Sequence, residues 1–166
     1  MKVIGVIPAR LYSSRFPKKI LHLIDGKPMV VHVYEQALKA KSLDDVIVAI
    51  DADETETSLN EWKVKTIMTS DNHVSGTDRI QEAVVDIEAD VVVNIQGDEP
   101  TINPLLIDEL VQQFEDTTIE MATVAGQDMD VENIMDVNAV KVLLDGGGFA
   151  VNFRREPVET EAGGYY

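Results

Sequence analysis

The chain has 166 residues, 45% of them apolar and none of them cysteine, which indicates a globular protein and excludes disulfides and thiolate metal sites. Fourteen Lys and Arg against 30 Asp and Glu give a formal net charge of −16, which argues against nucleic acid as a partner. No apolar run reaches membrane-spanning length and the N-terminus lacks a signal-peptide layout, so we expect a cytoplasmic protein with no membrane partner.

The apolar pattern alternates between strands and helices. Strands are predicted at about 3–8, 45–50, 64–68, 90–95, 120–125, 139–144 and 149–153, the last two joined as a hairpin by Gly146-Gly147-Gly148. Helices are predicted at about 28–41, 54–61, 77–88, 104–115 and 131–136, with Asn103 as the N-cap of the fourth. This alternation favours an α/β fold in which a doubly wound, mainly parallel sheet carries helices on both faces.

The positive charge is concentrated near the N-terminus. Residues 1–41 hold eight basic and two acidic side chains, a net +6, whereas the remaining residues hold six basic and 28 acidic ones, a net −22. Four of those cations, with two hydroxyls between them, follow Pro8, which ends the first apolar run: Arg10, Ser13, Ser14, Arg15, Lys18 and Lys19. A loop at the carboxyl end of a parallel strand is where open α/β sheets bind ligands, so a nucleoside triphosphate is one interpretation. A basic surface loop explains the charge equally well.

A second stretch, Ser75-Gly76-Thr77-Asp78-Arg79, stands at the start of a predicted helix. Ser75 or Thr77 can cap that helix, and Gly76 lets a ligand approach the backbone closely. An ordinary N-cap with one surface arginine is the favoured interpretation of this segment when it is considered alone.

The third stretch, Gln96-Gly97-Asp98-Glu99-Pro100, directly follows the most apolar run. Gly97 permits a sharp turn, and the two carboxylates are hard oxygen ligands of the kind that hold Mg²⁺ together with substrate phosphates. A solvated acidic turn is the alternative. Cations at one strand end and acids at another are the charge layout expected of a metal–triphosphate site.

Other candidates are weaker. Acids at the end of the second strand, Asp51, Asp53 and Glu54, are explained by the dipole of the helix that follows. The three histidines have no metal-ligand spacing, so zinc is not expected. Arg155 could meet a substrate carboxylate or merely offset neighbouring acids.

Five stretches in register resemble a known family. They read IPARLYSSRFPKK, DGKPMVVHV, TSDNHVSGTDRI, VVVNIQGDEP and NAVKVLLDGGGFAVNFRREPV, and they are similar to the 3-deoxy-manno-octulosonate (KDO) cytidylyltransferases, the CMP-KDO synthetases. The resemblance implies a homodimeric nucleotidyltransferase with a Rossmann-like mixed sheet of the nucleotide-diphospho-sugar transferase type. Its reaction would convert CTP and a keto-sugar acid into CMP-KDO and pyrophosphate for lipopolysaccharide synthesis.

The same resemblance implies roles for individual residues. Arg10, Ser14, Arg15 and Lys19 would grip the triphosphate and stabilise its developing charge, next to Pro8 and Ala9 of the nucleotide-binding stretch. Asp98 would hold Mg²⁺ as cofactor, Ser75 and Arg79 would help to seat the cytidine, and Gln96 would lie beside nucleotide and sugar. Arg155 would contact the sugar.

Two departures from the family pattern bear on these expectations. Lys18 stands where a glycine is common, which restricts the backbone if that position needs a positive φ. Family members also continue for roughly another third of their length, which contains a second metal-binding aspartate, so residues 1–166 are expected to be one nucleotidyltransferase domain that is incomplete at its C-terminus. A sialic-acid-type cytidylyltransferase, an enzyme using another nucleotide and a nucleotide-binding module without turnover remain as alternatives. Which keto-sugar acid is used (KDO, its 8-amino analogue or a nonulosonic acid) stays open.

Overall fold

The computed structural model describes residues 1–12, 16–126 and 135–156. Contacts within the chain divide it into two compact units, Met1–Ala122 and Thr123–Tyr166. The predicted helix at 131–136 lies for the most part outside the described residues. That the whole chain forms one domain stays a prediction.

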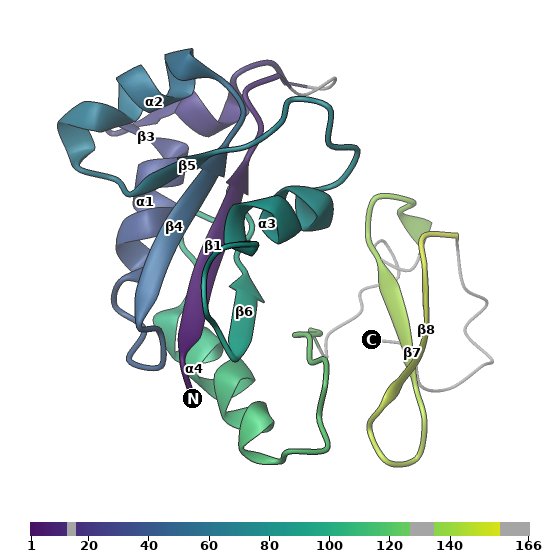
Figure 1. The fold of residues 1–166 in the computed structure, drawn as a ribbon. Helices are drawn as coiled ribbons and strands as arrows, with labels where there is room; N and C mark the ends of the chain where they lie inside the picture. Colours follow the sequence, from purple (N-terminus) through teal and green to yellow (C-terminus); the bar gives the residue numbers. More distant parts are fainter. Residues whose placement is uncertain (13–15, 127–134, 157–166) are drawn as a thin grey trace. The chain divides into compact units, whose positions relative to one another are not determined.

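A four-stranded parallel sheet forms the centre of the first unit, in the order β5-β4-β1-β6 (Figure 1). Its strands are β1 (Val3–Ala9), β4 (Asp45–Ile50), β5 (Thr66–Met68) and β6 (Val91–Asn94). In the register, Ala9 lies opposite Ile50 and Val6 lies opposite Asn94. The carboxyl ends of β1, β4 and β6 therefore reach the same edge of the sheet, as the sequence predicts for a ligand-binding α/β fold.

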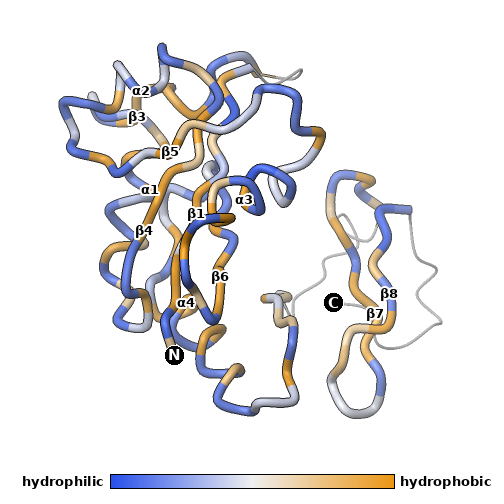
Figure 2. The backbone as a smooth tube through the Cα atoms, in the orientation of Figure 1, coloured by the Kyte–Doolittle hydropathy of each residue, from blue (hydrophilic) through white to orange (hydrophobic). Residues whose placement is uncertain are grey.

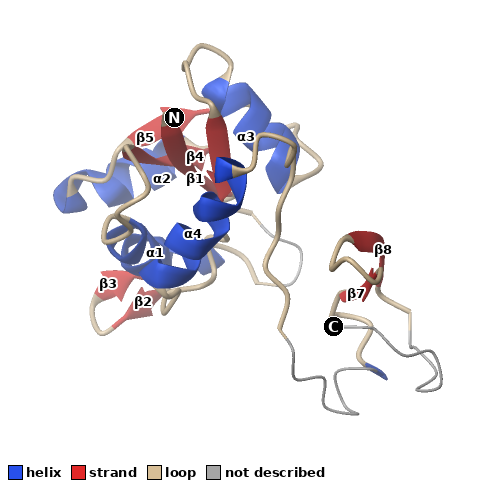
Figure 3. Ribbon diagram, turned by 90° about the horizontal axis from the view of Figure 1, so that it is seen from below, coloured by secondary structure: helices blue, strands red, loops and turns tan. Residues whose placement is uncertain are grey.

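Helices cover both faces of this sheet, which confirms the doubly wound prediction (Figure 3). They are α1 (Met29–Ala37), α2 (Asp53–Leu59), α3 (Gly76–Val84) and α4 (Pro104–Gln112), with 3-10 turns η1 (Lys19–Leu21), η2 (Asn60–Trp62) and η3 (Gln113–Glu115). Successive residues of a strand face opposite sides, so Val3 and Ile7 of β1 join the core with α1 and α4, whereas Ile4 and Val6 pack with α3. The apolar stretches of β1 and β4 between these two layers are evident in Figure 2.

The helix starts follow from local chemistry. The Asn103 side chain accepts a hydrogen bond from the Leu105 N–H at 3.1 Å, and Pro104 opens α4, so the predicted N-cap is confirmed. Ahead of α1, a small hairpin of β2 (Leu23–Ile24) and β3 (Lys27–Pro28) turns at Asp25 and Gly26, both with positive φ. These two short strands were not among those predicted from the sequence.

The second unit contains an antiparallel pair, β7 (Lys141–Leu144) and β8 (Ala150–Arg154). The connecting turn closes through the Asp145 N–H and the Phe149 carbonyl at 2.9 Å, which confirms the predicted hairpin. The predicted strand at 120–125 is wrong: these residues form no strand in the structure. An alternating apolar pattern becomes a strand only where a sheet edge pairs with it, and in the described chain none pairs with this segment. Within the described ranges, no helix combines the length and apolar character that crossing a membrane requires.

Candidate functional site

The three stretches singled out in the sequence meet around Pro8, at the carboxyl end of β1. A Cβ placed on Gly97, after β6, would lie 3.1 Å from the Pro8 carbonyl oxygen. One placed on Gly76, at the start of α3, would lie 3.3 Å from the Pro8 Cγ. Because they have no side chain, both glycines let their backbone pack closely against Pro8. The structure therefore brings the basic loop, the start of α3 and the QGDEP turn together at one edge of the sheet.

Lys19 and Asp98 are in direct contact at this edge. The Lys19 Nζ lies 2.7 Å from the Asp98 Oδ2, and the two side chains are 41% and 48% exposed. Lys19 is placed by η1, and Asp98 follows Gly97 in the turn that leaves β6. An exposed pair of this kind is weak, so it can open at little cost in free energy.

Lys18 adopts the left-handed conformation, with φ 57° and ψ 26°. This is the position at which the family pattern commonly has a glycine and this sequence has a lysine. Its N–H donates to the Leu11 carbonyl at 2.8 Å and closes the basic loop at its base. Its ammonium pairs with Glu54 of α2, and the hydrogen bond to Glu54 raises the pKa of Lys18.

Arg10 is exposed and donates from Nη2 to the His73 carbonyl oxygen at 3.2 Å, in the segment that precedes α3. That segment is held in turn by Glu82, whose carboxylate accepts from the Ser70 N–H at 3.0 Å and contacts the His73 ring. Pro8 is half-buried and the Ala9 side chain is buried in the core, so at Ala9 only backbone is available to a ligand.

Ser75 is the N-cap of α3. Its hydroxyl oxygen accepts from the Asp78 N–H at 3.1 Å, and the Asp78 carboxylate accepts from the Ser75 N–H at 3.2 Å, which completes a capping box. The interpretation of this segment as a helix cap is therefore confirmed. A contact between Ser75 and a cytidine stays a prediction.

Arg79 is 2% exposed, so this residue is not the surface arginine that the cap interpretation expected. Its guanidinium lies 3.0 Å from Asp51 and donates to the Thr69 hydroxyl and to the Ser70 carbonyl. The other oxygen of Asp51 accepts from the Leu11 N–H at 2.9 Å. Sequence reasoning assigned Asp51 to the helix dipole and missed this role. The available signal was its position directly after a buried strand.

The remaining predicted residues lie in three places. Gln96 is exposed and donates to Asn94 at 3.2 Å on the edge strand. Ser14 and Arg15 lie outside the described residues. Arg155 belongs to the second unit, where its guanidinium donates to the Asn138 carbonyl at 2.7 Å.

The described residues contain no group of three or more acidic or histidine side chains that could enclose a metal ion. Asp98 supplies one exposed carboxylate, with Glu99 next to it. Mg²⁺ is often held by one or two carboxylates while substrate phosphates and water complete its shell. The donors present fit that mode of binding and not an all-protein cage.

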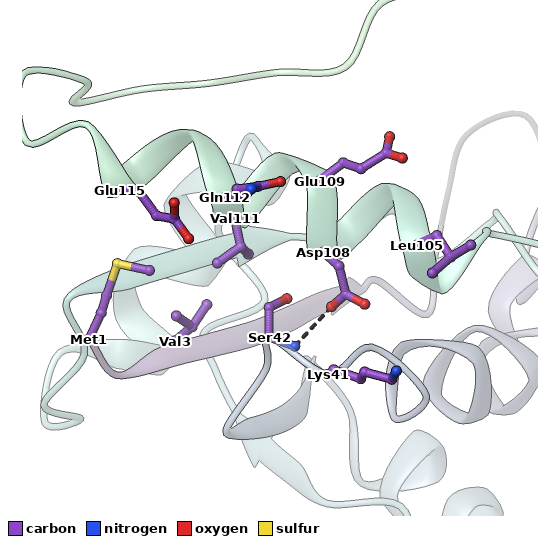
Figure 4. A pocket seen from close by; sticks show the side chains of 10 residues that line it. All are labelled: Met1, Val3, Lys41, Ser42, Leu105, Asp108, Glu109, Val111, Gln112 and Glu115. Carbon is purple, nitrogen blue, oxygen red and sulfur yellow. Dashed lines mark hydrogen bonds between the residues drawn. The ribbon is translucent and has the colours of Figure 1, made fainter.

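A hollow lies at the opposite, amino end of the strands (Figure 4). It runs between Val3, Lys41, Ser42 and α4, where the Ser42 N–H donates to Asp108 at 2.8 Å. The convergence of side chains around Pro8 is at the other end of β1, so the hollow is separate from the candidate site.

The comparisons with known proteins show the family and the fold of the chain. The family model described as cytidylyltransferase matches residues 4–161, and the chain belongs to this family. A 3-deoxy-manno-octulosonate cytidylyltransferase of Geotalea daltonii is 41% identical over 159 residues, which cover 95% of this chain and 63% of that protein. The enzyme of the same name from Chloroherpeton thalassium is 44% identical over 161 residues, covering 95% and 65%. The chain thus spans about 63% of the length of the curated relatives it matches.

Among solved structures, CMP:2-keto-3-deoxy-manno-octonic acid synthetase in complex with CTP matches with a TM-score of 0.89 and 38% identity. The match covers 98% of this chain and 68% of that one. A 4-diphosphocytidyl-2C-methyl-D-erythritol synthase, 14% identical with a TM-score of 0.63 over 99% of this chain and 70% of its own, shares the fold. The predicted family and the predicted nucleotidyltransferase fold are therefore confirmed.

Proposed function

We propose that this chain carries the nucleotide-binding part of a cytidylyltransferase that transfers CMP from CTP to KDO or a close keto-sugar acid. The observation that carries the proposal is the contact of Lys19 with Asp98 at the carboxyl edge of the sheet. Support comes from the 38% identical relative whose structure contains CTP. A homodimer, a cytoplasmic location and a role in lipopolysaccharide synthesis belong to the same proposal, as implications of the family.

In the proposed reaction, the anomeric hydroxyl of the sugar attacks the α-phosphorus of CTP in line, and pyrophosphate leaves. Negative charge grows on the phosphate oxygens and on the departing group. Lys19 is partly exposed and Arg10 is exposed at this edge, and both would neutralise that charge. The protein contributes position and electrostatics and forms no covalent bond with the substrate.

Asp98 is the residue that would hold Mg²⁺ in this site, in exchange for Lys19. When bound, the ion would supply positive charge against the phosphates. Lys19, no longer paired with Asp98, would donate to the triphosphate.

The experiment is a comparison of nucleotides and of sugar acids with the purified chain. Calorimetric titration with CTP, UTP and ATP in MgCl₂ measures binding, and release of pyrophosphate in the presence of KDO or N-acetylneuraminic acid measures turnover. We expect CTP to bind at least about tenfold more tightly than UTP or ATP, a margin that a few base-specific hydrogen bonds supply.

Each outcome has a clear meaning. No binding of CTP overturns the proposal. Tighter binding of another nucleotide favours a different transferase, and turnover with the sialic acid but not with KDO favours the sialic-acid type. CTP binding without pyrophosphate release favours a nucleotide-binding module without turnover.

A further inference from the structure

A buried polar network lies beneath the basic loop, and the only role given to it so far is the cytidine contact that the family resemblance implies for Arg79. It consists of Asp51, Arg79, Thr69 and the backbone of Leu11. The Asp51 and Arg79 side chains are 7% and 2% exposed, and their closest atoms lie 3.0 Å apart. Thr69 accepts from Arg79 and donates to the Ile50 carbonyl at 2.7 Å. The network therefore joins the ends of β4 and β5 to the first turns of α3.

Stability alone does not explain such a network. Taking two charges out of water costs free energy that their attraction often only offsets, so a buried ion pair is weak evidence of a stabilising role. What it does supply is a fixed geometry, because each charge confines the other. Here the confined group is the Asp51 carboxylate, which has one oxygen on Arg79 and the other on the Leu11 N–H.

Leu11 is the point at which the basic loop closes. Its N–H donates to Asp51 at 2.9 Å, and its carbonyl oxygen accepts from the Lys18 N–H at 2.8 Å. Arg10 directly precedes this closure and Lys19 directly follows it. The two cations that face the proposed triphosphate therefore depend on where the Leu11–Lys18 closure is held.

We propose that Asp51 is a positioning residue of the nucleotide site, and that Arg79 acts through it. Asp51 fixes the base of the basic loop through the Leu11 amide, and Arg79 fixes the orientation of the Asp51 carboxylate. This inference rests on the proposed binding of CTP. It assigns Arg79 a place behind the loop instead of a direct contact with the cytidine.

The test compares Asp51→Asn with Ile80→Ala. Asparagine keeps the size and one acceptor but loses the charge that strengthens the Leu11 hydrogen bond. Ile80 follows Arg79 on α3 and is buried in the apolar layer under that helix, so its truncation destabilises the same element without touching the network. Calorimetry with CTP, thermal unfolding, and amide hydrogen exchange at Leu11 are measured on both variants, at a temperature where circular dichroism shows each to be folded.

We expect Asp51→Asn to weaken CTP binding by at least about tenfold and to accelerate exchange at Leu11 by about the same factor, the size of effect of one charge-assisted hydrogen bond. Ile80→Ala should lower Tm at least as much as Asp51→Asn does. It should leave the CTP affinity and the exchange rate at Leu11 within about twofold of the values for the unmodified chain. Unchanged CTP affinity in folded Asp51→Asn overturns the inference, as does an equal loss in Ile80→Ala.

A second variant keeps the test decisive if Asp51→Asn does not fold. Arg79→Lys retains the positive charge beside Asp51 but loses the planar fork that donates to Asp51, Thr69 and Ser70 at the same time. It should weaken CTP binding and accelerate amide exchange at Leu11 by factors similar to those of Asp51→Asn. Full CTP affinity in this variant contradicts the inference. If the unmodified chain itself fails to bind CTP, the proposed function is wrong and the loop-positioning role is still tested by the exchange rate at Leu11.

Discussion

Lys19 and Asp98 stand 79 positions apart in the chain, yet the ammonium of one lies 2.7 Å from the carboxylate of the other. They meet because β1 and β6 are neighbouring parallel strands, and each residue follows the carboxyl end of its strand. In the proposed site they would separate, because Lys19 would bind phosphate and Asp98 would bind Mg²⁺. Each ligand would then compete with the contact between the two side chains, and that competition can be measured.

Replacement of Asp98 by Asn should separate the two roles. Without Mg²⁺, CTP binding should be unchanged or up to about fivefold tighter, because Lys19 no longer has to leave a carboxylate. The strengthening of CTP binding by Mg²⁺ in the unmodified chain should disappear, and pyrophosphate release should be largely abolished. Calorimetry with CTP in EDTA and in MgCl₂ measures both effects. A variant that still responds to Mg²⁺ as the original does would show that Asp98 is not the metal ligand.

Replacement of Lys18 by Gly should stabilise the chain. A left-handed φ is strained for lysine and is free for glycine, and the ion pair with Glu54 that the change removes is exposed and weak. We expect Tm to rise by about 2–4 °C in a scanning unfolding experiment. Lys63→Gly is the matched control, because Lys63 follows η2 with a similar φ of 54°. The backbone strain of a lysine in the left-handed region is therefore the same at both positions. If Lys63→Gly raises Tm and Lys18→Gly lowers it, the Glu54 contact outweighs the backbone strain.

Replacement of Ser75 tests whether its hydroxyl serves the helix or the nucleotide. Ser75→Ala removes the N-cap of α3 and should lower the free energy of unfolding by about 1 kcal/mol. Ser75→Asn supplies another good cap and should restore most of that stability. CTP affinity is then measured on Ser75→Asn. A loss of affinity in this stable variant supports the predicted cytidine contact, whereas full affinity shows that the cap is the whole role of the side chain.

The parts of the fold that could be predicted are those whose signal is local. The runs that became β1, β4 and β6 are apolar, and such runs were enough to predict a parallel sheet, although β1 continues through Pro8 to Ala9. The site followed from the rule that parallel strands gather their carboxyl ends at one edge. That rule placed Lys19 and Asp98 in one neighbourhood, although it could not predict that they touch.

The parts that could not be predicted depend on a partner elsewhere in the chain. An acid ahead of a helix is explained by the helix dipole, so the only local difference between Asp51 and Asp53 was that Asp51 directly follows β4, whereas Asp53 lies in the first turn of α2. Its ion pair with Arg79 joins positions 28 residues apart and depends on the packing of α3 against the sheet. The apolar segment at 120–125 failed for the same reason, since a strand requires an edge that the sequence pattern does not describe.

The contact of Glu82 with His73 predicts a pH dependence of stability. The His73 side chain first, and the Ser70 N–H second, hold the pKa of Glu82 below its ordinary value of 4.5. Because the folded pKa is lowered, the stabilisation is complete above pH 4.5 and is lost as the pH falls through the folded value. Glu82→Gln should therefore have a lower Tm at pH 7, by at most about 3 °C for an exposed group, and the difference should vanish at acid pH. Glu88→Gln, an exposed change on the loop after α3, should show no such pH-dependent difference.

Replacement of Gly97 by Ala tests the convergence on Pro8 directly. The new Cβ would stand 3.1 Å from the Pro8 carbonyl oxygen, which is backbone and cannot rotate away, so β1 and the QGDEP turn must move apart. We expect a loss of about 1–3 kcal/mol in the free energy of unfolding, measured with urea, and a weaker affinity for CTP because Asp98 is the next residue. Gly126→Ala is the control, since its added Cβ meets nothing within 4 Å and should leave both measurements unchanged. If Gly97→Ala is as stable as the control, the two strand ends have room between them that the structure does not show, and the geometry on which the nucleotide site depends is wrong.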